Sequence, residues 1–228
     1  MLYLKNLAYN GGIVISFVVK IYKLNDNTVG SLTQYQKSLI IGTVLGDGYL
    51  RIIPGRKDAF LEINHSFLQK KYVDWKFEKL RNICISRPKA RRSSGKRIAY
   101  RFYTKQHPEI TELYRSFYRN DKKIVPNNLE IDDIALSVWF MDDGSVCGNS
   151  NFYLNTQQFS KNDQIKLLSI LNKINLKAKL NRDKNYYRIR FILSSVKRLK
   201  ELIEKNLIPS MYYKIGLDPV ETLSNKTG

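Results

Sequence analysis

The hydrophobic pattern of the chain changes period several times between residues 31 and 218, and each change predicts a boundary between helix and strand. Two stretches, 39–50 and 136–146, are apolar at most positions over the length of a helix, and each contains Asp-Gly near its end. Apolar residues recur every three or four positions in four further segments, which predicts amphipathic helices at 69–80, 108–118, 161–174 and 196–205. A Pro-Gly turn at 54–55 predicts a return strand at 59–65. Strict alternation predicts antiparallel strands, apolar on one side and basic on the other, at 96–104, 176–181 and 188–191.

The two apolar stretches carry signals for where their helices begin and end. Thr33 and Gln36 have the spacing of a capping box, so the first helix should begin after Thr33. Gly48 is a plausible residue to end it. The second helix should begin after residues 126–128 and end at Gly144.

The order of elements is repeated once along the chain. In each half an apolar helix with Asp-Gly is followed by a turn-rich hairpin, a helix, a basic hairpin, another helix and then Val-Pro or Ile-Pro. Two copies indicate a pseudo-twofold molecule rather than a solenoid. Gly42 and Gly46 share one face of the first helix and would let a second helix approach closely. The predicted organisation is an N-terminal extension at 1–30, a first half at 31–126 and a second half at 127–228.

The net charge of the chain indicates which class of molecule it binds. The 228 residues include 39 Lys and Arg against 20 Asp and Glu, a formal net charge of +19, and 12% are aromatic. Basic residues recur along most of the chain, which favours a nucleic acid as partner. The apolar run at 13–19 is too short to span a bilayer, so no membrane partner is expected. Two cysteines and two histidines are too few for a disulfide scaffold or a repeated Cys/His zinc motif.

The two Asp-Gly sequences suggest a shared metal site. If the apolar helices pack side by side in the same direction, Asp47 and Asp143 meet at one end of the seam. Paired carboxylates repel each other unless a cation lies between them, and oxygen ligands favour Mg²⁺. On a basic surface, such a site indicates metal-assisted hydrolysis of a phosphodiester. One Asp-Gly would more simply be a helix end, but two at matching positions favour the site.

These segments resemble the paired signature helices of the LAGLIDADG homing endonucleases, in particular single-chain members encoded in organellar ribosomal-RNA introns. The resemblance covers about residues 31–218, although neither helix matches the nine letters of the family name. It is carried by the sequences IGTVLGDGYL (41–50), VPNNL (125–129), WFMDDG (139–144), YLNTQQF (153–159) and LIPSMYYK (207–214).

The resemblance implies a fold and an active site. The fold would be α+β, with two αββαββα halves whose antiparallel sheets form a saddle on DNA and whose interface consists of two helices. Asp47 and Asp143 would ligate Mg²⁺ across the seam, with further ligands from the backbone carbonyls of Gly46 and Asp142. One basic residue per half, Lys123 (or its neighbour Lys122) and Lys214, would stabilise negative charge on the phosphate or orient the attacking water.

The resemblance also implies which strand residues face the DNA, where side chains on two-stranded ribbons read base edges in the major groove. The predicted DNA contacts of the first half are Arg51, Arg56, Lys57, Asn64, Arg97, Arg101 and Tyr103, with Lys89 and Arg91 more typical of phosphate contacts. Those of the second half are Asn149, Asn151, Gln157, Lys177, Lys179, Arg182, Arg188 and Arg190. Because the halves have diverged, the target should be long and non-palindromic, the protein a monomer, and the product a staggered double-strand break.

Other functions remain open at this point. Asp74 and Lys76 have the D-x-K spacing of restriction-type nucleases, but the segment reads as an amphipathic helix rather than a strand. His65 could approach DNA or simply pack in the core. An intron maturase, which binds its own intron RNA and assists splicing, would use the same fold and basic faces. The Lys-, Asn- and Ile-rich composition is typical of AT-rich genomes and suggests a mitochondrion, a chloroplast or a bacterial cytoplasm.

Overall fold

The structure, a computed structural model, describes residues 30–92, 98–148 and 150–217, and all of these except Gly30 belong to a compact unit that begins at Ser31. The predicted N-terminal extension, apart from Gly30, lies outside the described residues. So do two of the nominated DNA contacts, Arg97 and Asn149. Within the described ranges, every helix is too short or too polar to cross a membrane.

The elements follow the same order twice. The first half consists of α1 (Gln34–Leu45), β1 (Tyr49–Arg51), β2 (Phe60–Ser66), α2 (Lys70–Leu80), β3 (Lys89–Arg92), β4 (Ile98–Tyr103) and α3 (Pro108–Phe117). The second consists of α4 (Asp133–Asp143), β7 (Gly144–Cys147), β8 (Asn151–Leu154), α5 (Lys161–Lys173), β9 (Ala178–Asp183), β10 (Tyr186–Phe191) and α6 (Leu193–Ile203). Short elements complete the chain: the 3-10 turns η1 (Phe67–Gln69), η2 (Arg81–Ile83) and η3 (Pro209–Ile215), and the hairpin β5 (Tyr118–Arg119) and β6 (Lys122–Lys123).

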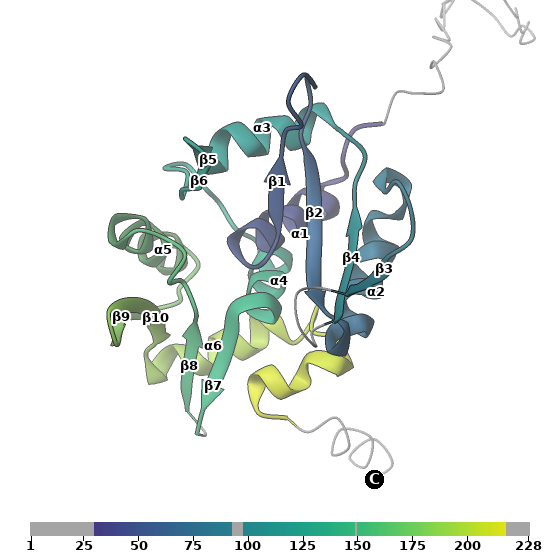
Figure 1. The fold of residues 1–228 in the computed structure, drawn as a ribbon. Helices are drawn as coiled ribbons and strands as arrows, with labels where there is room; N and C mark the ends of the chain where they lie inside the picture. The colour runs from purple at the N-terminus through teal and green to yellow at the C-terminus, as the bar shows by residue number, and fades with distance from the viewer. Residues whose placement is uncertain (1–29, 93–97, 149, 218–228) are drawn as a thin grey trace, which may run out of the picture. The chain divides into compact units, whose positions relative to one another are not determined.

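The two sheets have the same topology. Their strand orders are β1-β2-β4-β3 and β7-β8-β10-β9, and every neighbouring pair is antiparallel. Each half is therefore an αββαββα unit, and the predicted fold class is confirmed (Figure 1). Alternation along the strands was also predicted well: Tyr100, Phe102, Ile189 and Phe191 point into the core, whereas the arginines between them remain accessible.

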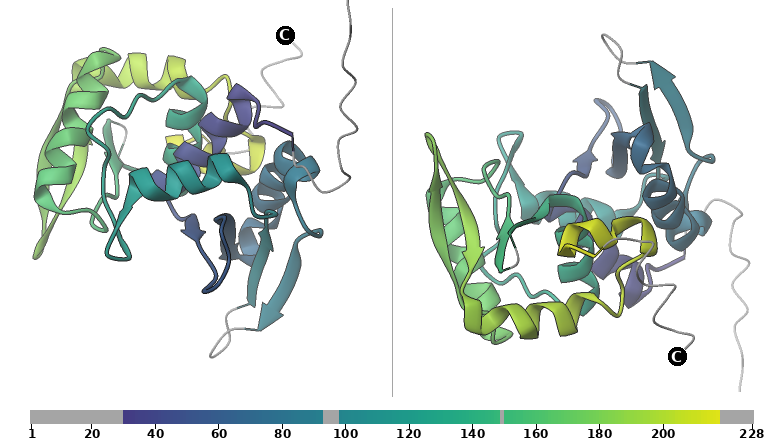
Figure 2. Two further views of the ribbon diagram at one scale, coloured as in Figure 1. Left: turned by 90° about the horizontal axis from the view of Figure 1, so that it is seen from above. Right: turned by 90° about the horizontal axis from the view of Figure 1, so that it is seen from below.

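The helices α1 and α4 pack side by side between the two sheets (Figures 1 and 2). Their contact is close because α1 has glycine where α4 approaches. A Cβ on Gly42 would lie 2.3 Å from the carbonyl oxygen of Ala135, and one on Gly46 would lie 2.4 Å from Cβ of Asp142. No larger residue fits there without moving a helix. Gly42 and Gly46 thus form the predicted helix–helix seam.

The ends of these helices differ from the sequence prediction. Thr33 and Gln36 do form the capping box, but α1 ends at Leu45 with Gly46 as its C-cap, not at Gly48. The backbone N–H of Gly48 instead donates to Thr43 O at 2.8 Å, which closes a turn that contains Asp47. The helix α4 ends at Asp143 with Gly144 as its C-cap, one residue before the predicted end, and it begins only at Asp133, where the Asp132 carboxylate caps its first turn.

Replacing Gly42 with alanine should destabilise the fold. Alanine favours a helix by about 1 kcal/mol over glycine, but overpacking a tight contact costs roughly 1–3 kcal/mol, and here the obstacle is backbone. We expect a lower denaturation midpoint with an unchanged slope. Gly30→Ala is the control, since a Cβ there meets nothing within 4 Å. An unchanged or higher midpoint for Gly42→Ala would show that the seam is loosely packed.

Candidate active site at the end of the helix seam

The two predicted acids lie at the same end of the seam. Asp143 is the last residue of α4, and Asp47 lies in the turn that follows α1. The side chain of Asp47 is 49% exposed, and Asp143 is partly exposed. The side-chain amide of Gln158 joins the two helix ends, because its Nε2 donates to Gly46 O at 3.2 Å and lies 3.3 Å from Asp143 Oδ2. The sequence prediction that the two Asp-Gly ends come together is therefore correct.

Polar groups surround Asp143 on one side of the seam. Lys123 Nζ donates to the carbonyl oxygen of Gly46 at 2.9 Å and to Gln158 Oε1 at 3.1 Å. Lys122, its alternative in the sequence analysis, is exposed. We call this set the Asp143 centre: the Asp143 carboxylate, the Gly46 carbonyl, Lys123 and Gln158. Each half thus contributes to it, because Gly46 and Asp143 come from different helices.

A matching set surrounds Asp47 on the other side. Lys214 Nζ donates to the carbonyl oxygens of Asp142 and Gly144 at 3.0 and 2.9 Å. His65 Nδ1 lies 3.6 Å from Asp47 Oδ2. We call this set the Asp47 centre: the Asp47 carboxylate, the Asp142 carbonyl, His65 and Lys214. It mirrors the Asp143 centre, since Asp142 corresponds to Gly46 in the repeat.

The Asp142 side chain has a different environment from the two acids. Lys76 Nζ lies 2.8 and 3.0 Å from its two oxygens, and neither side chain is exposed. Asp142 Oδ2 also accepts the backbone N–H of Asp47 at 3.3 Å. Asp47, His65 and Asp142 have ligand atoms within 4.8 Å of one another, which could suit a metal ion. The Lys76 ammonium already neutralises Asp142, so its carboxylate is poorly suited to hold one.

Burial, and after it the crowding of the acids, shifts the pKa values at the site. Burial, together with Asp47 and Asp142, raises the pKa of Asp143 to about 8. Burial and the Asp142 carboxylate also raise the pKa of Asp47 above its usual range. Burial lowers the pKa of Lys123 to about 8 and shifts the pKa of Lys214 in the same direction. Carboxylates that resist ionisation together favour a cation between them.

His65 is the third ionisable group at the Asp47 centre. It lies on the core face of β2, and burial followed by the positive charge of Lys76 lowers its pKa to about 4. The ring is therefore neutral near neutral pH. Its Nδ1 contacts Gln69 Oε1 at 3.2 Å, whereas Nε2 has no hydrogen-bond partner and lies 3.8 Å from Asp142 Oδ1. His65 contributes no positive charge to the Asp47 centre.

The donors exposed at the seam fit a hard divalent cation. Each centre offers one carboxylate and one backbone carbonyl, and Mg²⁺ prefers oxygen ligands while keeping waters and phosphate oxygens for its other positions. Burial, together with Asp47 and Asp142, disfavours the ionised form of Asp143, and a bound cation would favour that form. Asp47, Asp143 and the carbonyls of Gly46 and Asp142 could therefore hold Mg²⁺ as the sequence suggested.

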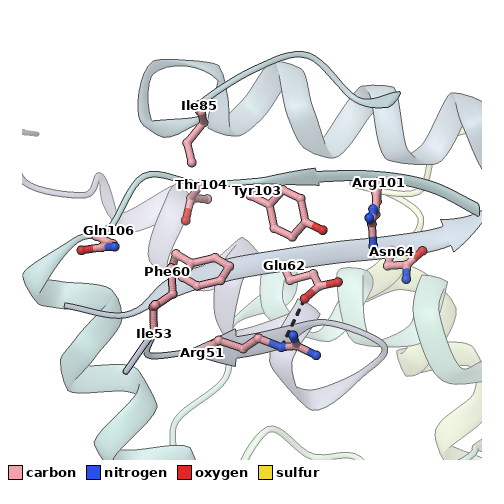
Figure 3. Close-up of a pocket in the computed structure, with 10 residues that line it drawn as sticks. All are labelled: Arg51, Ile53, Phe60, Glu62, Asn64, Ile85, Arg101, Tyr103, Thr104 and Gln106. Carbon is pink, nitrogen blue, oxygen red and sulfur yellow. Dashed lines mark ion pairs between the residues drawn. The ribbon is translucent and has the colours of Figure 1, made fainter. Parts of the chain in front are cut away.

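Most predicted DNA contacts of the first half share one face of its sheet. Strand pairing sets Asn64 opposite Arg101 and Lys89 opposite Arg101, so these side chains point the same way. The face contains a hollow of about 640 Å³, shown in Figure 3, where Arg51 forms an ion pair with Glu62 at 3.2 Å. The predicted contacts that lie on the sheet and are at least partly exposed are Arg51, Asn64, Lys89, Arg91, Arg101 and Tyr103. Arg56 and Lys57 are exposed in the loop between β1 and β2.

The second half presents a similar face with one exception. Arg190 pairs with Lys179 across the sheet, and Arg190 Nη2 donates to Asn151 Oδ1 at 2.5 Å. Arg188, Lys179 and Lys177 lie on the same side of the alternation. Arg182 instead pairs with Tyr187, which puts it on the face opposite Arg188 and Arg190, and its contact with DNA stays a prediction. The Gln157 side chain points toward Asp183, with its Nε2 3.4 Å from Asp183 Oδ2.

The sequence analysis assigned no role at the site to three residues that lie there, namely Lys76, His65 and Gln158. Lys76 lies at the predicted helix α2, not in a strand, so the D-x-K reading is rightly discarded. Its position was nonetheless a signal, because it falls on the apolar face with Tyr72 and Leu80. His65 follows the alternation of buried residues in β2, which indicated burial but not the neighbouring acids. Gln158 stands beside the nominated Gln157 and carries no signal of its own.

Comparison with known proteins agrees with this geometry. Residues 37–199 match the LAGLIDADG DNA endonuclease family. The chain belongs to this family. Among structures, the LAGLIDADG fold of the chain is similar to that described as "The homing endonuclease I-WcaI bound to its DNA recognition sequence", with a TM-score of 0.77 and 28% identity over 83% of this chain and 88% of that one.

Two relatives of this LAGLIDADG chain differ in described role. Probable intron-encoded endonuclease 1 of Wickerhamomyces canadensis is 28% identical over 214 residues, 88% of this chain and 90% of the relative. Cytochrome b mRNA maturase bI2 of Saccharomyces cerevisiae is 27% identical over 210 residues, 84% of this chain. The match spans only 49% of that maturase. The family thus includes relatives named for DNA cleavage and relatives named for RNA maturation.

Replacing Asp143 with asparagine should stabilise the metal-free protein at about pH 8. The folded-state pKa of about 8 exceeds the ordinary 3.8, so the parent loses stability as the pH rises between these values, and the amide escapes this loss. We expect a gain of roughly 1–3 kcal/mol in unfolding free energy, discounted for solvent screening, by urea denaturation with EDTA. Near pH 4 the difference should vanish. An equal gain at both pH values would rule out ionisation as its cause.

Proposed function

We propose that the chain is an intron-encoded, site-specific DNA endonuclease that requires Mg²⁺ and makes a staggered double-strand break in a long, non-palindromic target. The observation that carries this proposal is the meeting of Asp47 and Asp143 at one end of the seam, each beside a backbone carbonyl of the other helix and a lysine. Two such centres in one molecule suit two cuts, one in each strand.

The proposed roles follow from the position of each group. Mg²⁺, held by the two aspartates with the carbonyls of Gly46 and Asp142, would stabilise the attacking and leaving oxygens of phosphodiester hydrolysis. Lys123 and Lys214 would neutralise charge on the phosphate at the Asp143 and Asp47 centres respectively. Their partly buried ammonium groups keep this charge close to the acids, where water screens it weakly.

The two basic sheet faces support a DNA duplex as partner. Their arginines and lysines are of the kind that bind phosphates and read guanine in the major groove. Because the halves have diverged, each face should read a different sequence, and one monomer should span the whole site. The relative from Wickerhamomyces canadensis that is named as a probable intron-encoded endonuclease supports a gene that lies in an intron. The composition of the chain supports a protein that works in a mitochondrion, a chloroplast or a bacterial cytoplasm.

A second function, assistance in splicing of the intron RNA, is favoured by the maturase relatives. The same basic faces could bind an RNA helix, and splicing assistance does not require the two acids. A splicing assay with the intron precursor would separate the functions, because Asp47→Asn should leave maturase activity intact.

Replacing Asp47 with asparagine should abolish double-strand cleavage while DNA binding persists. A bound metal ion supplies several kcal/mol of transition-state stabilisation, so cleavage should fall by at least about 100-fold. Binding to the intronless allele should remain within about threefold, since phosphate contacts dominate affinity. Cleavage of a target plasmid with Mg²⁺ and gel-shift titration would measure the two. Cleavage at the parental rate would mean that Asp47 does not hold the metal.

Replacing either lysine with methionine should produce an enzyme that nicks DNA, and the two variants should spare opposite strands. Lys123→Met removes the ammonium of the Asp143 centre, and Lys214→Met that of the Asp47 centre, each with a loss of about 100-fold at its own strand. End-labelled duplexes separate the strand rates. Lys122→Met is the matched control, because Lys122 is exposed. Equal loss on both strands in either variant would contradict the assignment of one lysine to each centre.

A further inference from the structure

Lys76 is a fully buried cation directly beneath the candidate active site. Its side chain has no exposure, and its ammonium lies 2.8 and 3.0 Å from the Asp142 oxygens and 4.5 Å from the centre of the Tyr72 ring. Other lysines of α2, such as Lys71 and Lys79, are exposed. Lysine is rarely buried completely unless it is paired, so this position has a specific partner rather than a general surface role.

The contacts of this pair lead to Asp47. The Asp142 carboxylate accepts the backbone N–H of Asp47, and Asp142 Oδ1 lies 3.8 Å from His65 Nε2. His65 in turn faces the Asp47 carboxylate at 3.6 Å. At the Asp143 centre, the corresponding contacts are made by Gln158 and Lys123. The pair is therefore connected to one of the two centres more directly than to the other.

The repeat does not reproduce this arrangement. The position that corresponds to Asp142 in α1 is Gly46, and a Cβ there would lie only 2.4 Å from Cβ of Asp142. The seam has space for one side chain at this level, and Asp142 occupies it. Among the described residues, one carboxylate, that of Asp142, therefore lies beneath the two centres, and one internal cation, Lys76, neutralises it.

We propose that Lys76 is a positioning residue of the Asp47 centre, whose ammonium holds the Asp142 carboxylate against the backbone of Asp47 and thereby fixes where the Asp47 carboxylate lies. This inference rests on the proposed endonuclease function. The ammonium is a permanent substitute for a metal ion at Asp142. It leaves the two exposed acids to bind the catalytic cations, and it makes the two centres unequal in how they are held.

The test compares cleavage of the two strands in three variants. Lys76→Met leaves Asp142 without its cation, so cleavage of the strand that Lys214→Met also impairs should fall by about 10–100-fold, the usual effect of groups that orient ligands. The strand that Lys123→Met impairs should be cut at close to the parental rate, so nicked plasmid accumulates. Lys71→Met, an exposed residue of the same helix, is the control and should cut both strands like the parent.

Two double variants keep the test decisive if Lys76→Met does not fold. Lys76→Met with Asp142→Asn is neutral and retains an acceptor for the Asp47 N–H, whereas Lys76→Met with Asp142→Leu is neutral and lacks it. Apolar replacement of a buried ion pair is commonly tolerated. The asparagine variant should bring the two strand rates back toward each other, and the leucine variant should keep them at least about tenfold apart. Equal strand rates in both double variants would overturn the proposal.

A second measurement distinguishes failure of this inference from failure of the endonuclease proposal. In ¹⁵N-aspartate-labelled protein, the amide of Asp47 should exchange with solvent at least about tenfold faster in the leucine double variant than in the parent or Lys71→Met, because its acceptor is lost. If the parent cuts neither strand, the endonuclease proposal fails, while the amide still decides whether Asp142 holds Asp47. Unchanged exchange would refute the positioning role whatever the cleavage result.

Discussion

Close contact between α1 and α4 is the constraint on which the rest of the structure depends. Glycine at positions 42 and 46 removes the side chains that would separate the helices, so backbone and Cβ atoms of α4 occupy their place. Because the helices run in the same direction, this contact also fixes which groups meet at their ends. Two aspartates from distant parts of the sequence become neighbours, and each lies beside a backbone carbonyl that belongs to the other half.

Such an arrangement concentrates negative charge, and the surrounding residues respond to it in two ways. Inside the protein, Lys76 neutralises Asp142, a pairing whose disruption would cost about 3–5 kcal/mol because it would strand a buried charge. Toward solvent, Lys123 and Lys214 hydrogen-bond to carbonyls without contacting the acids directly. Burial and the nearby Asp47 and Asp142 carboxylates hold the pKa of Asp143 at about 8. The Asp142 charge is thus paired inside the protein, whereas the two acids at the end of the seam are not paired with a lysine in the described structure.

Local signals in the sequence predicted much of this structure. The capping box at Thr33, the repeat of Asp-Gly helices and the alternation in the strands depend on neighbouring residues, and all three were interpreted correctly. Contacts between distant residues were harder. Lys76 and Asp142 are 66 positions apart, and an ion pair leaves no periodic pattern in a sequence. The nomination of Arg182 as a DNA contact rested on its charge alone, and the strand pairing places it on the face opposite Arg188 and Arg190.

The seam also explains why the two halves should belong to one chain. In a symmetric dimer, the residue before the aspartate of Asp-Gly would be the same in both helices. Two aspartates at this level would overlap, since the space beside Asp142 exists only because position 46 has no side chain. Two glycines would leave that space unfilled and Lys76 without its carboxylate. The combination of glycine at position 46 with aspartate at position 142 therefore requires two halves whose sequences can differ. The same independence allows the two sheet faces to present different side chains, so the difference between the faces and the asymmetric pair of Gly46 and Asp142 both depend on two halves that diverged within a single polypeptide.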